Sequence, residues 1–455
     1  MDARRRACLS IAGLDPSGGA GVLVDAMVFQ SLGFHAACVA ASLTVQNTRS
    51  VSAVVGVDAD LVRRQLESVA EDLEVAAVKT GALWSKENVE VVAEFLKKLP
   101  ERPCVVDPVL RAKGGERLFE EGAVRKLVDE LLPLASSATP NVDEAQALTG
   151  VEVRSEEDVE EALLRLKELG VKVPLVKGWL KNGEVIDAIL YGGRVHFLGA
   201  EAIGEARGSG CVFSAALAAY LAMGLDPLKA VAEARKLARR AIKCSVKAGF
   251  GFNVVNPIVQ LQYAEARLKT LEDVRRGVSE LEARPELSIL MPEVRMNLVA
   301  IPEGAEEANE AVGVEGRVTL VGGRLRASGP PWFGASSHLA RLLVALHKRL
   351  PSVRAALNIK YSPEVVEVCR GLGLKLVRLR REEEPPEVGG VEGASMEWVA
   401  KRALEGLEGG VDAIYDEGGV GKEAMVRLLG QSVDEVLEKA VRIASKLLER
   451  LGNRQ

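Results

Sequence analysis

Residues 204–224 read GEARGSGCVFSAALAAYLAMG, a glycine-rich turn that leads into a long apolar helical pattern. Glycines ahead of a helix let backbone N–H groups point at an anion, and the helix dipole adds partial positive charge there. Gly208, Gly210 and the helix start at Cys211 therefore suit a phosphoryl group. The alternative is a tight turn beside a small buried thiol, and these residues alone do not decide between the two.

Strands alternate with helices throughout the region that precedes this turn. Strand patterns occur at 7–14, 36–45, 76–83, 103–110 and 173–178, and helical patterns at 21–33, 58–73 and 155–170. This alternation predicts an α/β fold, with a doubly wound, mainly parallel sheet and helices on both faces. In such sheets a site lies beyond the carboxyl ends of the strands, which is where the glycine-, Asp- and Asn-rich segments fall.

The 455 residues are enough for two or three domains. We expect a first domain over 1–263, a connecting helix over 264–284 and a second, smaller α/β domain over 285–455. The segment 264–284 reads AEARLKTLEDVRRGVSELEAR, which is charged and shows no apolar stripe wide enough for a core. The alternation of strands and helices restarts after Pro285.

Composition excludes several classes of function. The chain is 48% hydrophobic and 27% charged with a formal net charge of -5, so nothing favours a nucleic acid as partner. No apolar run reaches membrane-spanning length, and the run after Arg6 indicates a first buried strand in preference to a signal peptide. The six scattered cysteines form no C-x-x-C or Cys/His cluster. We therefore expect no zinc site, and a reduced, cytoplasmic setting.

Other strand ends of the first domain carry polar residues that favour the phosphate interpretation. The segment 13–21, GLDPSGGAG, is a second glycine-rich turn, although it does not match the dinucleotide fingerprint G-x-G-x-x-G. Asp25 lies in an apolar helical stretch, where a carboxylate is either exposed or paired with a ligand. Gln46 and Asn47 follow another strand.

Further along, Asn141 and Glu144 share one side of a helix start, where an acidic group can hold hydrated Mg²⁺. Lys177 ends a strand and offers a cation for phosphates. Each has an alternative interpretation. Asn141 can be a helix cap with Glu144 as its capping-box partner, and Lys177 can be a solvated strand end.

In their order along the chain, these motifs resemble those of the hydroxymethylpyrimidine/phosphomethylpyrimidine kinases of thiamine biosynthesis, which have the ribokinase fold. The set comprises GLDPSGGAG, Asp25, LTVQNT, KTGAL, DPVL followed by Lys113-Gly114, TPNVDEA, LVKG and GSGC. The resemblance implies ATP-dependent, Mg²⁺-assisted phosphorylation of 4-amino-5-hydroxymethyl-2-methylpyrimidine and then of its monophosphate, giving the diphosphate. It also implies a homo-oligomer.

The resemblance assigns roles to individual positions. It places Gly13, Asp25 and Gln46 at the pyrimidine, Asn141, Lys177 and Ser209 at the nucleotide, and Glu144 at Mg²⁺; Gly208 and Gly210 form the anion hole.

Cys211 stands where related sugar kinases carry an aspartate base. Because a helix N-terminus lowers the pKa of a thiol from about 8.5, we expect a thiolate base. Phosphoryl transfer depends mostly on positioning and charge neutralisation, so the anion hole can matter more than Cys211.

Four positions, in three motifs, depart from the family pattern. Arg207-Gly208-Ser209 replaces the usual His-Gly-Thr, Trp179 replaces the second glycine of Lys-Gly-Gly, and Met27 stands where a lysine is customary. These changes bear on nucleotide contacts and on substrate affinity, and leave the reaction class unchanged.

The second domain has its own set of polar strand and helix ends. Ser336 and His338 lie at a helix start, and Asn358 and Lys360 lie at a strand end. Lys422 lies in DEGGVGKE, which fails the P-loop pattern but can still form a phosphate nest. For His338 alone, a structural role beside the helix start explains the sequence equally well.

These motifs, with PEVRMNLVAIP, Gly316-Arg317 and RREEEP, resemble the archaeal-type thiamine-phosphate synthase domain. The resemblance implies coupling of the pyrimidine diphosphate to hydroxyethylthiazole phosphate with release of pyrophosphate. We expect Arg317 and His338 to serve the chemistry, and the remaining candidates to bind substrate: Ser336, Asn358, Lys360 and Lys422.

A sensor is the alternative for this second domain, since related domains follow helix-turn-helix modules and bind thiamine phosphates. The sequence shows no DNA-binding module or basic face, which favours the synthase. A non-catalytic oligomerisation or feedback module is a third possibility.

Overall fold

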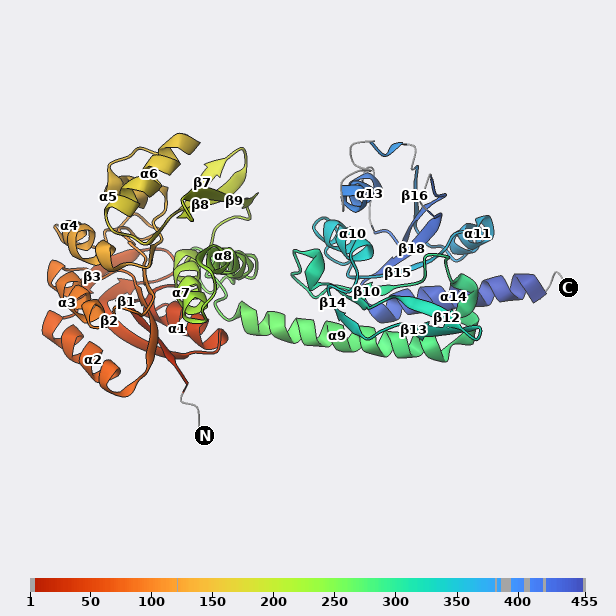
Figure 1. Ribbon diagram of the computed structural model, residues 1–455, viewed down its shortest axis with the longest axis horizontal. Helices are drawn as coiled ribbons and strands as arrows, with labels where there is room; N and C mark the ends of the chain where they lie inside the picture. The colour runs from red at the N-terminus through yellow and green to blue at the C-terminus, as the bar shows by residue number, and fades with distance from the viewer. Residues whose placement is uncertain are drawn as a thin grey trace. The chain divides into compact units, whose positions relative to one another are not determined.

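A computed structural model gives the structure of residues 5–120, 122–380, 383–385, 394–404, 410–419 and 423–452. The chain divides into two compact units, Met1–Leu261 and Gln262–Gln455. Figure 1 shows that each unit is built around its own sheet. Among the described helices, none combines the length and the apolar character that crossing a bilayer requires.

The first unit contains a nine-stranded sheet with the order β3-β2-β1-β4-β5-β6-β7-β8-β9. The six strands from β2 to β7 in this order are parallel, and β3, β8 and β9 join antiparallel at the two edges. This confirms the predicted mainly parallel sheet. The strands are β1 (Ala7–Leu14), β2 (His35–Gln46), β3 (Val51–Gly56), β4 (Val75–Thr80), β5 (Cys104–Val106), β6 (Ser137–Ala138), β7 (Val173–Lys181), β8 (Glu184–Tyr191) and β9 (Arg194–Glu201).

Helices cover both faces of this sheet and enclose a separate apolar core on each (Figure 1). One layer holds α2 (Ala59–Asp72), α3 (Lys86–Lys97), α5 (Val142–Thr149) and α6 (Glu156–Glu168), together with the short α4 (Ala123–Lys126) and the turns η1 (Leu127–Leu131) and η2 (Leu132–Leu134). The other layer holds α1 (Gly21–Ser31), α7 (Ser209–Ala222) and α8 (Pro227–Lys243).

Helix α7 is the apolar helix that follows the Gly-Ser-Gly-Cys turn, and it is buried on nearly all sides. Its N-cap, Gly208, has φ +89°, a conformation that other residues rarely adopt. A Cβ at this position would lie 2.3 Å from the carbonyl oxygen of Gly19. The backbone of the first glycine-rich turn therefore lies directly against the second, and Gly208 is required for this close approach.

The second unit contains a seven-stranded sheet with the order β14-β11-β10-β15-β18-β17-β16 and a separate β12-β13 hairpin. Only the β16–β17 pair of this sheet is parallel among the described strands. The strands are β10 (Leu298–Ala300), β11 (Val312–Val314), β12 (Val318–Val321), β13 (Arg324–Ala327), β14 (Pro331–Phe333), β15 (Ala355–Lys360), β16 (Leu376–Leu379), β17 (Ala413–Asp416) and β18 (Met425–Gly430).

Helices also cover both faces of the second sheet. One core contains residues of α9 (Val259–Ala283), η3 (Pro285–Leu290), α11 (Pro363–Gly371) and α14 (Val433–Gly452). The opposite core contains residues of α10 (His338–His347) and α13 (Ala394–Leu404), and the short turn η4 (Ala308–Glu310) packs beside α10.

The segment 264–284 is helical, as predicted, but it is part of the second unit's core. Leu271, Val274, Val278 and Leu281 of α9 are all buried there. The expectation that this helix lacks a core-facing stripe was therefore wrong. The spacing of three, four and three residues forms a narrow seam, like that of a coiled coil, instead of the wide stripe of a typical surface helix.

Candidate functional site

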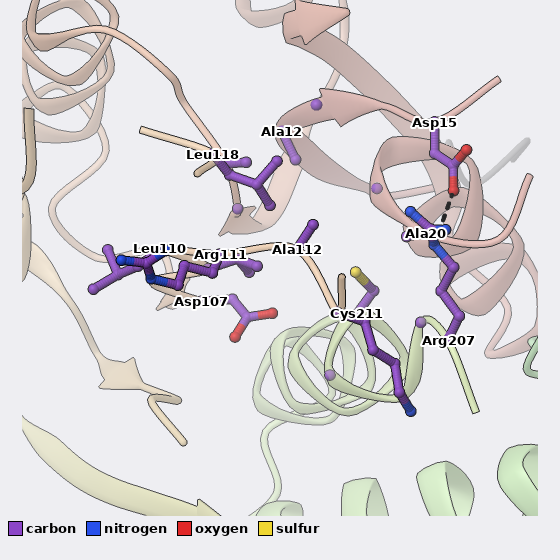
Figure 2. A pocket seen from close by; sticks show the side chains of 18 of the residues that line it. Ala12, Asp15, Ala20, Asp107, Leu110, Arg111, Ala112, Leu118, Arg207 and Cys211 are labelled. Carbon is purple, nitrogen blue, oxygen red and sulfur yellow. Dashed lines mark ion pairs between the residues drawn. The ribbon is translucent and has the colours of Figure 1, made fainter. Parts of the chain in front are cut away.

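A cavity of about 570 Å³ lies at the carboxyl ends of the parallel strands of the first unit. Figure 2 shows Cys211 at the first turn of α7, with Arg207 beside it and Asp15 facing the Arg207 guanidinium. The cavity brings together predicted residues from five segments of the chain: Gly13, Gln46, Asn141, Glu144, Lys177, Gly208, Ser209, Gly210 and Cys211.

The start of α7 forms one wall of this cavity and has the features of an anion site. No side chain caps the helix, so the N–H groups of its first turn keep their hydrogen-bonding capacity for a ligand. A Cβ on Gly210 would lie 3.6 Å from Lys177 Nζ, which places this ammonium group beside the helix start. Backbone donors, the helix dipole and one cation thus converge at this wall.

Asp107 is a component of the site that the sequence analysis did not single out. It lines the cavity, is 2% exposed, and its Oδ1 accepts hydrogen bonds from Thr139 Oγ1 at 2.9 Å and Lys177 Nζ at 3.1 Å. Its Oδ2 accepts a hydrogen bond from Ser214 Oγ at 3.0 Å. The aspartate of the DPVL motif was the available signal. Asp107 connects Lys177 to helix α7.

Asn141 and Glu144 form the capping box that was the alternative interpretation of these residues. Asn141 Oδ1 accepts from the Glu144 N–H, and Glu144 Oε2 accepts from the Asn141 N–H, both at 2.9 Å. Both residues nevertheless line the cavity. Burial raises the pKa of Glu144 to about 7, with Lys177 opposing this shift and Asp107 adding to it.

The acidic groups of the cavity fit a nucleotide-bound Mg²⁺ better than a protein-only metal site. Among the residues described, no group of three or more His, Cys, Asp or Glu side chains could hold a metal ion. Mg²⁺ is commonly held by one or two carboxylates together with phosphate oxygens. Asp107 and Glu144 would supply two such carboxylates.

The expected low pKa of Cys211 is wrong. Burial raises the pKa of this thiol to about 11, and the nearby Lys79 ammonium offsets only part of that effect. Asp25 and Asp107 raise the pKa further. Loss of solvation outweighs the attraction of the helix N-terminus for a thiolate, so Cys211 is a neutral thiol near pH 7.

Asp25 does not line the cavity, contrary to its expected contact with the pyrimidine. Its side chain is fully buried, and its Oδ2 accepts from Lys79 Nζ at 2.8 Å and from Ser10 Oγ at 2.6 Å. Lys79 itself lines the cavity. Burial alone would lower the pKa of Lys79, but Asp25 raises it above its ordinary value. Lys79, itself almost fully buried, thus stands between Asp25 and the cavity.

Arg207 is one of two residues beside the anion site, with Ser209, that depart from the family pattern. It is 7% exposed and donates from Nη1 to the Asn47 carbonyl at 2.6 Å and from Nη2 to Gln46 Oε1 at 2.7 Å. Its Nε lies 3.8 Å from Asp15 Oδ2. Arg207 thus connects the end of β2 to the β1–α1 turn.

In the second unit, strand register places several polar residues on one face of the sheet. Asn358 is opposite Arg427, and Lys360 is opposite Met425, which is opposite Asp416. Arg427 and Asp416 form a buried ion pair at 2.7 Å that the sequence analysis missed. Helix α10, which begins at His338, covers the same face, and Ser336 is buried just before it.

Both polar groups of the Asn358 side chain hydrogen-bond to the backbone of a neighbouring segment. Its Oδ1 accepts from the Asn297 N–H at 2.7 Å, and its Nδ2 donates to the Arg295 carbonyl at 2.9 Å. These contacts hold segment 295–297 in place, so the expected binding role of Asn358 is not supported by its geometry. Lys360 is half-buried at the end of β15. Lys422 lies outside the described residues.

Arg317 lies in a strained turn. Its φ of +68° is uncommon for a residue with a side chain, and its Nη1 donates to the Val294 carbonyl. Arg295, whose guanidinium donates to the Gly316 carbonyl, has φ +71°. Two adjoining turns with left-handed arginines thus occur beside segment 295–297.

Comparison with known proteins gives the chain its family. Residues 15–256, just over half of the chain, match the family model for phosphomethylpyrimidine kinase. The chain belongs to the phosphomethylpyrimidine kinase family. Residues 273–442 match the model for thiamine-phosphate synthase ThiN. Apart from Gly13, the cavity residues named above lie within the first match, and Asn358 and His338 lie within the second.

Three curated relatives show how much of the chain is shared. The hydroxymethylpyrimidine/phosphomethylpyrimidine kinase of Aquifex aeolicus is 39% identical over 54% of this chain and 98% of that protein. The thiamine biosynthesis bifunctional protein ThiED of Geobacter sulfurreducens is 40% identical, and the match spans 56% of this chain but only 53% of that protein. The bifunctional thiamine biosynthesis protein ThiDN of Methanocaldococcus jannaschii is 28% identical over 97% of this chain and 99% of that protein.

Solved structures support the ribokinase-like fold of the kinase unit. The ADP complex of Bacillus subtilis pyridoxal kinase matches this chain with a TM-score of 0.53 and 30% sequence identity. The match covers 57% of this chain and 99% of the pyridoxal kinase chain. The predicted fold class is therefore confirmed, with a second α/β unit after it.

Proposed function

We infer that this chain is a bifunctional enzyme of thiamine biosynthesis. The kinase unit uses ATP to phosphorylate 4-amino-5-hydroxymethyl-2-methylpyrimidine and then its monophosphate. The synthase unit joins the resulting diphosphate to hydroxyethylthiazole phosphate and releases pyrophosphate. The observation that carries this inference is the presence of two family matches, over 15–256 and 273–442, in a chain that aligns along 97% of its length with a bifunctional thiamine biosynthesis protein.

Phosphoryl transfer in the kinase unit is assigned to the wall formed by the start of α7. The N–H groups of Ser209, Gly210 and Cys211 and the ammonium of Lys177 would neutralise charge on the transferred phosphoryl group. Asn141 stands on the same cavity and would contact the nucleotide. Asp107 and Glu144 would hold Mg²⁺, which supplies further neutralisation of phosphate charge when it is bound.

The substrate alcohol is assigned to the part of the cavity lined by Gly13 and Gln46. Because the Cys211 thiol is neutral near pH 7, it cannot take a proton until it is first ionised. Lys79, held by Asp25, is placed to stabilise negative charge at the cavity floor. This supports a reaction driven by electrostatic stabilisation, with proton removal late or minor.

For the synthase unit we propose that Arg317 and His338 serve the release of pyrophosphate, with Ser336 and Lys360 in binding roles. The left-handed φ of Arg317 supports this, since strained residues concentrate at functional sites. An arginine can stabilise departing pyrophosphate through a bidentate contact. Asn358 is excluded from this set because both of its polar groups hold segment 295–297.

We place the kinase within residues 1–263 and the synthase within 285–455, with segment 264–284 packed against the latter. A cytoplasmic enzyme agrees with Cys8, Cys104 and Cys369 being buried free thiols. A homo-oligomer is supported by the exposed Leu43, Val45 and Val55, which share one face of the β2–β3 pair.

Two assays on the full chain test this function. The first supplies the pyrimidine alcohol, ATP and Mg²⁺ and measures ADP and the pyrimidine diphosphate. The second supplies the pyrimidine diphosphate, thiazole phosphate and Mg²⁺ and measures thiamine phosphate. An absence of product in the second assay, together with tight binding of thiamine phosphate, would identify the second unit as a sensor.

A further inference from the structure

The contact between Arg207 and Gln46 fixes the orientation of an amide in the substrate part of the cavity. Arg207 Nη2 donates to Gln46 Oε1 at 2.7 Å, across 161 residues of sequence. A guanidinium group has only hydrogen-bond donors, so the oxygen of the amide must face it. The amide nitrogen of Gln46 is therefore the donor left for a ligand, and the oxygen keeps one further acceptor position.

Arg207 is itself held firmly enough to impose this orientation. Its second terminal nitrogen donates to the Asn47 carbonyl at 2.6 Å, and its backbone exchanges hydrogen bonds with Asn253 and Val255. Its stem packs beneath the first glycine-rich turn, because a Cβ on Gly19 would lie 3.4 Å from Arg207 Cδ. If the arginine side chain left Gln46, it would also lose its hydrogen bond to Asn47 and its packing against the first glycine-rich turn.

Among the described residues, the carboxylate that pairs with the Arg207 guanidinium is that of Asp15. Asp15 Oδ2 is buried without a hydrogen bond among the described residues and lies 3.8 Å from Arg207 Nε (Figure 2). Asp15 Oδ1 accepts from the N–H and hydroxyl groups of Ser17. Contacts therefore link the Asp15 carboxylate to the Arg207 guanidinium, and the guanidinium to the Gln46 amide at the substrate cavity.

We propose that Arg207 is a specificity-determining positioning residue. It fixes the orientation of the Gln46 amide, so that the amide pairs with only one arrangement of donor and acceptor groups on the substrate ring. The proposal rests on the proposed kinase function. The fixed amide offers a donor next to an acceptor. An aminopyrimidine has the complementary edge, with a ring nitrogen acceptor beside an exocyclic amine donor. Pyridoxine has a C–H group beside its ring nitrogen and lacks this edge.

The central test compares substrates in the Arg207→Met variant, which keeps an unbranched stem and removes every donor. With the amide free to turn, the KM for the pyrimidine alcohol should rise about tenfold, the effect of one lost hydrogen bond. The KM for ATP and the kcat should change less than about threefold. The ratio of kcat/KM between the pyrimidine alcohol and pyridoxine should fall by about tenfold.

Two further variants separate orientation from folding. Gln46→Glu retains an acceptor for Arg207 but loses the amide donor, so the melting temperature should hold while KM for the pyrimidine rises at least about tenfold. Arg207→Lys should restore part of the selectivity, because one ammonium can still donate to Gln46. Arg63→Met, which removes a surface arginine on α2, is the matched control and should leave both substrates unaffected.

The outcomes distinguish this proposal from the function on which it rests. If the wild-type chain fails to phosphorylate the pyrimidine alcohol, the kinase function is wrong. If the wild-type chain is active but Arg207→Met and Gln46→Glu keep the wild-type substrate ratio within about twofold, the orienting role of Arg207 is overturned. If Arg207→Met does not fold, Arg207→Lys and Gln46→Glu decide by the same ratio.

Discussion

The two units use the polar residues at their strand ends in different ways. In the kinase unit, nine of the predicted site residues line one cavity, and the uncapped start of α7 leaves backbone donors for a ligand. In the synthase unit, Asn358 uses both of its polar groups on the backbone of its neighbours, and Arg317 donates to a carbonyl. A polar residue at a strand end is therefore weak evidence of a site until its partners are known.

The comparison also shows which backbone features are informative. Gly208 is required because another segment of backbone lies against it, whereas Gly224, at the other end of the same helix, has open space around it. Both have positive φ. The first glycine shapes a site, and the second only ends a helix.

The largest effect is expected from Gly208→Ala, which tests the kinase half of this comparison. The new Cβ would clash with the Gly19 carbonyl and displace the first turn of α7. Kinase turnover should fall by about 10³-fold or more, as when donors of an oxyanion hole are lost. Coupled measurement of ADP release checks this.

Gly224→Ala is the matched control, since it has the same backbone strain without the contact. Kinase turnover should stay near the wild-type rate in this variant, and the synthase rate should be unchanged in both. Equal losses of kinase activity in the two variants would show that backbone strain, and not the shape of the anion site, explains the effect.

The next effect concerns the buried Asp25–Lys79 pair. Lys79→Met leaves the Asp25 carboxylate buried without its cation, which should destabilise the kinase unit by about 3–5 kcal/mol. Thermal unfolding of the full chain measures this loss. The double variant Lys79→Met/Asp25→Asn should recover most of the stability because no unpaired charge remains.

Kinase activity then separates the two roles of the pair. If Lys79 stabilises charge at the cavity floor, the double variant should fold well and still turn over slowly. Recovery of both stability and turnover would make the pair purely structural.

A smaller effect is expected in the chemistry of Cys211. Because burial raises the pKa of this thiol to about 11, its thiolate fraction near pH 8 should be about 200-fold below that of an ordinary cysteine. Iodoacetamide should therefore modify Cys211 slowly at pH 8, and the rate should rise with pH up to about 11. Mass spectrometry of the modified peptide follows the reaction.

Lys79→Met should slow this alkylation further, because the cation that favours the thiolate is removed. Rapid alkylation of Cys211 at pH 7 would contradict the raised pKa and restore the thiolate as a ready base.

The smallest effect tests the synthase half of the comparison. Asn358→Ala removes hydrogen bonds to Asn297 and Arg295 and should destabilise the second unit by about 1–3 kcal/mol. Lys360→Met should instead raise the KM for substrate with little change in stability. Thermal unfolding and the thiamine phosphate assay distinguish these results. The reverse pattern would return Asn358 to the binding site.

Much of this fold could be predicted from local sequence. Periods of two and of three to four residues predicted the alternating strands and helices, and the order of these elements predicted a mainly parallel sheet. The spacing of three between Asn141 and Glu144 predicted a capping box as one alternative, because both partners lie within one helical turn. Segment 264–284 was misjudged because its core-facing seam is narrow, although its helical period was clear.

The sequence by itself determined which residues are available at the strand ends, and the tertiary structure decided what each of them contacts. Asp25 and Lys79 are 54 residues apart, and Gln46 and Arg207 are 161 residues apart. No local pattern reports such pairs, since they form only when particular strands become neighbours in the sheet. Burial, which raises the pKa of Cys211 and keeps Asp25 from the cavity, likewise depends on how the finished layers pack around each side chain.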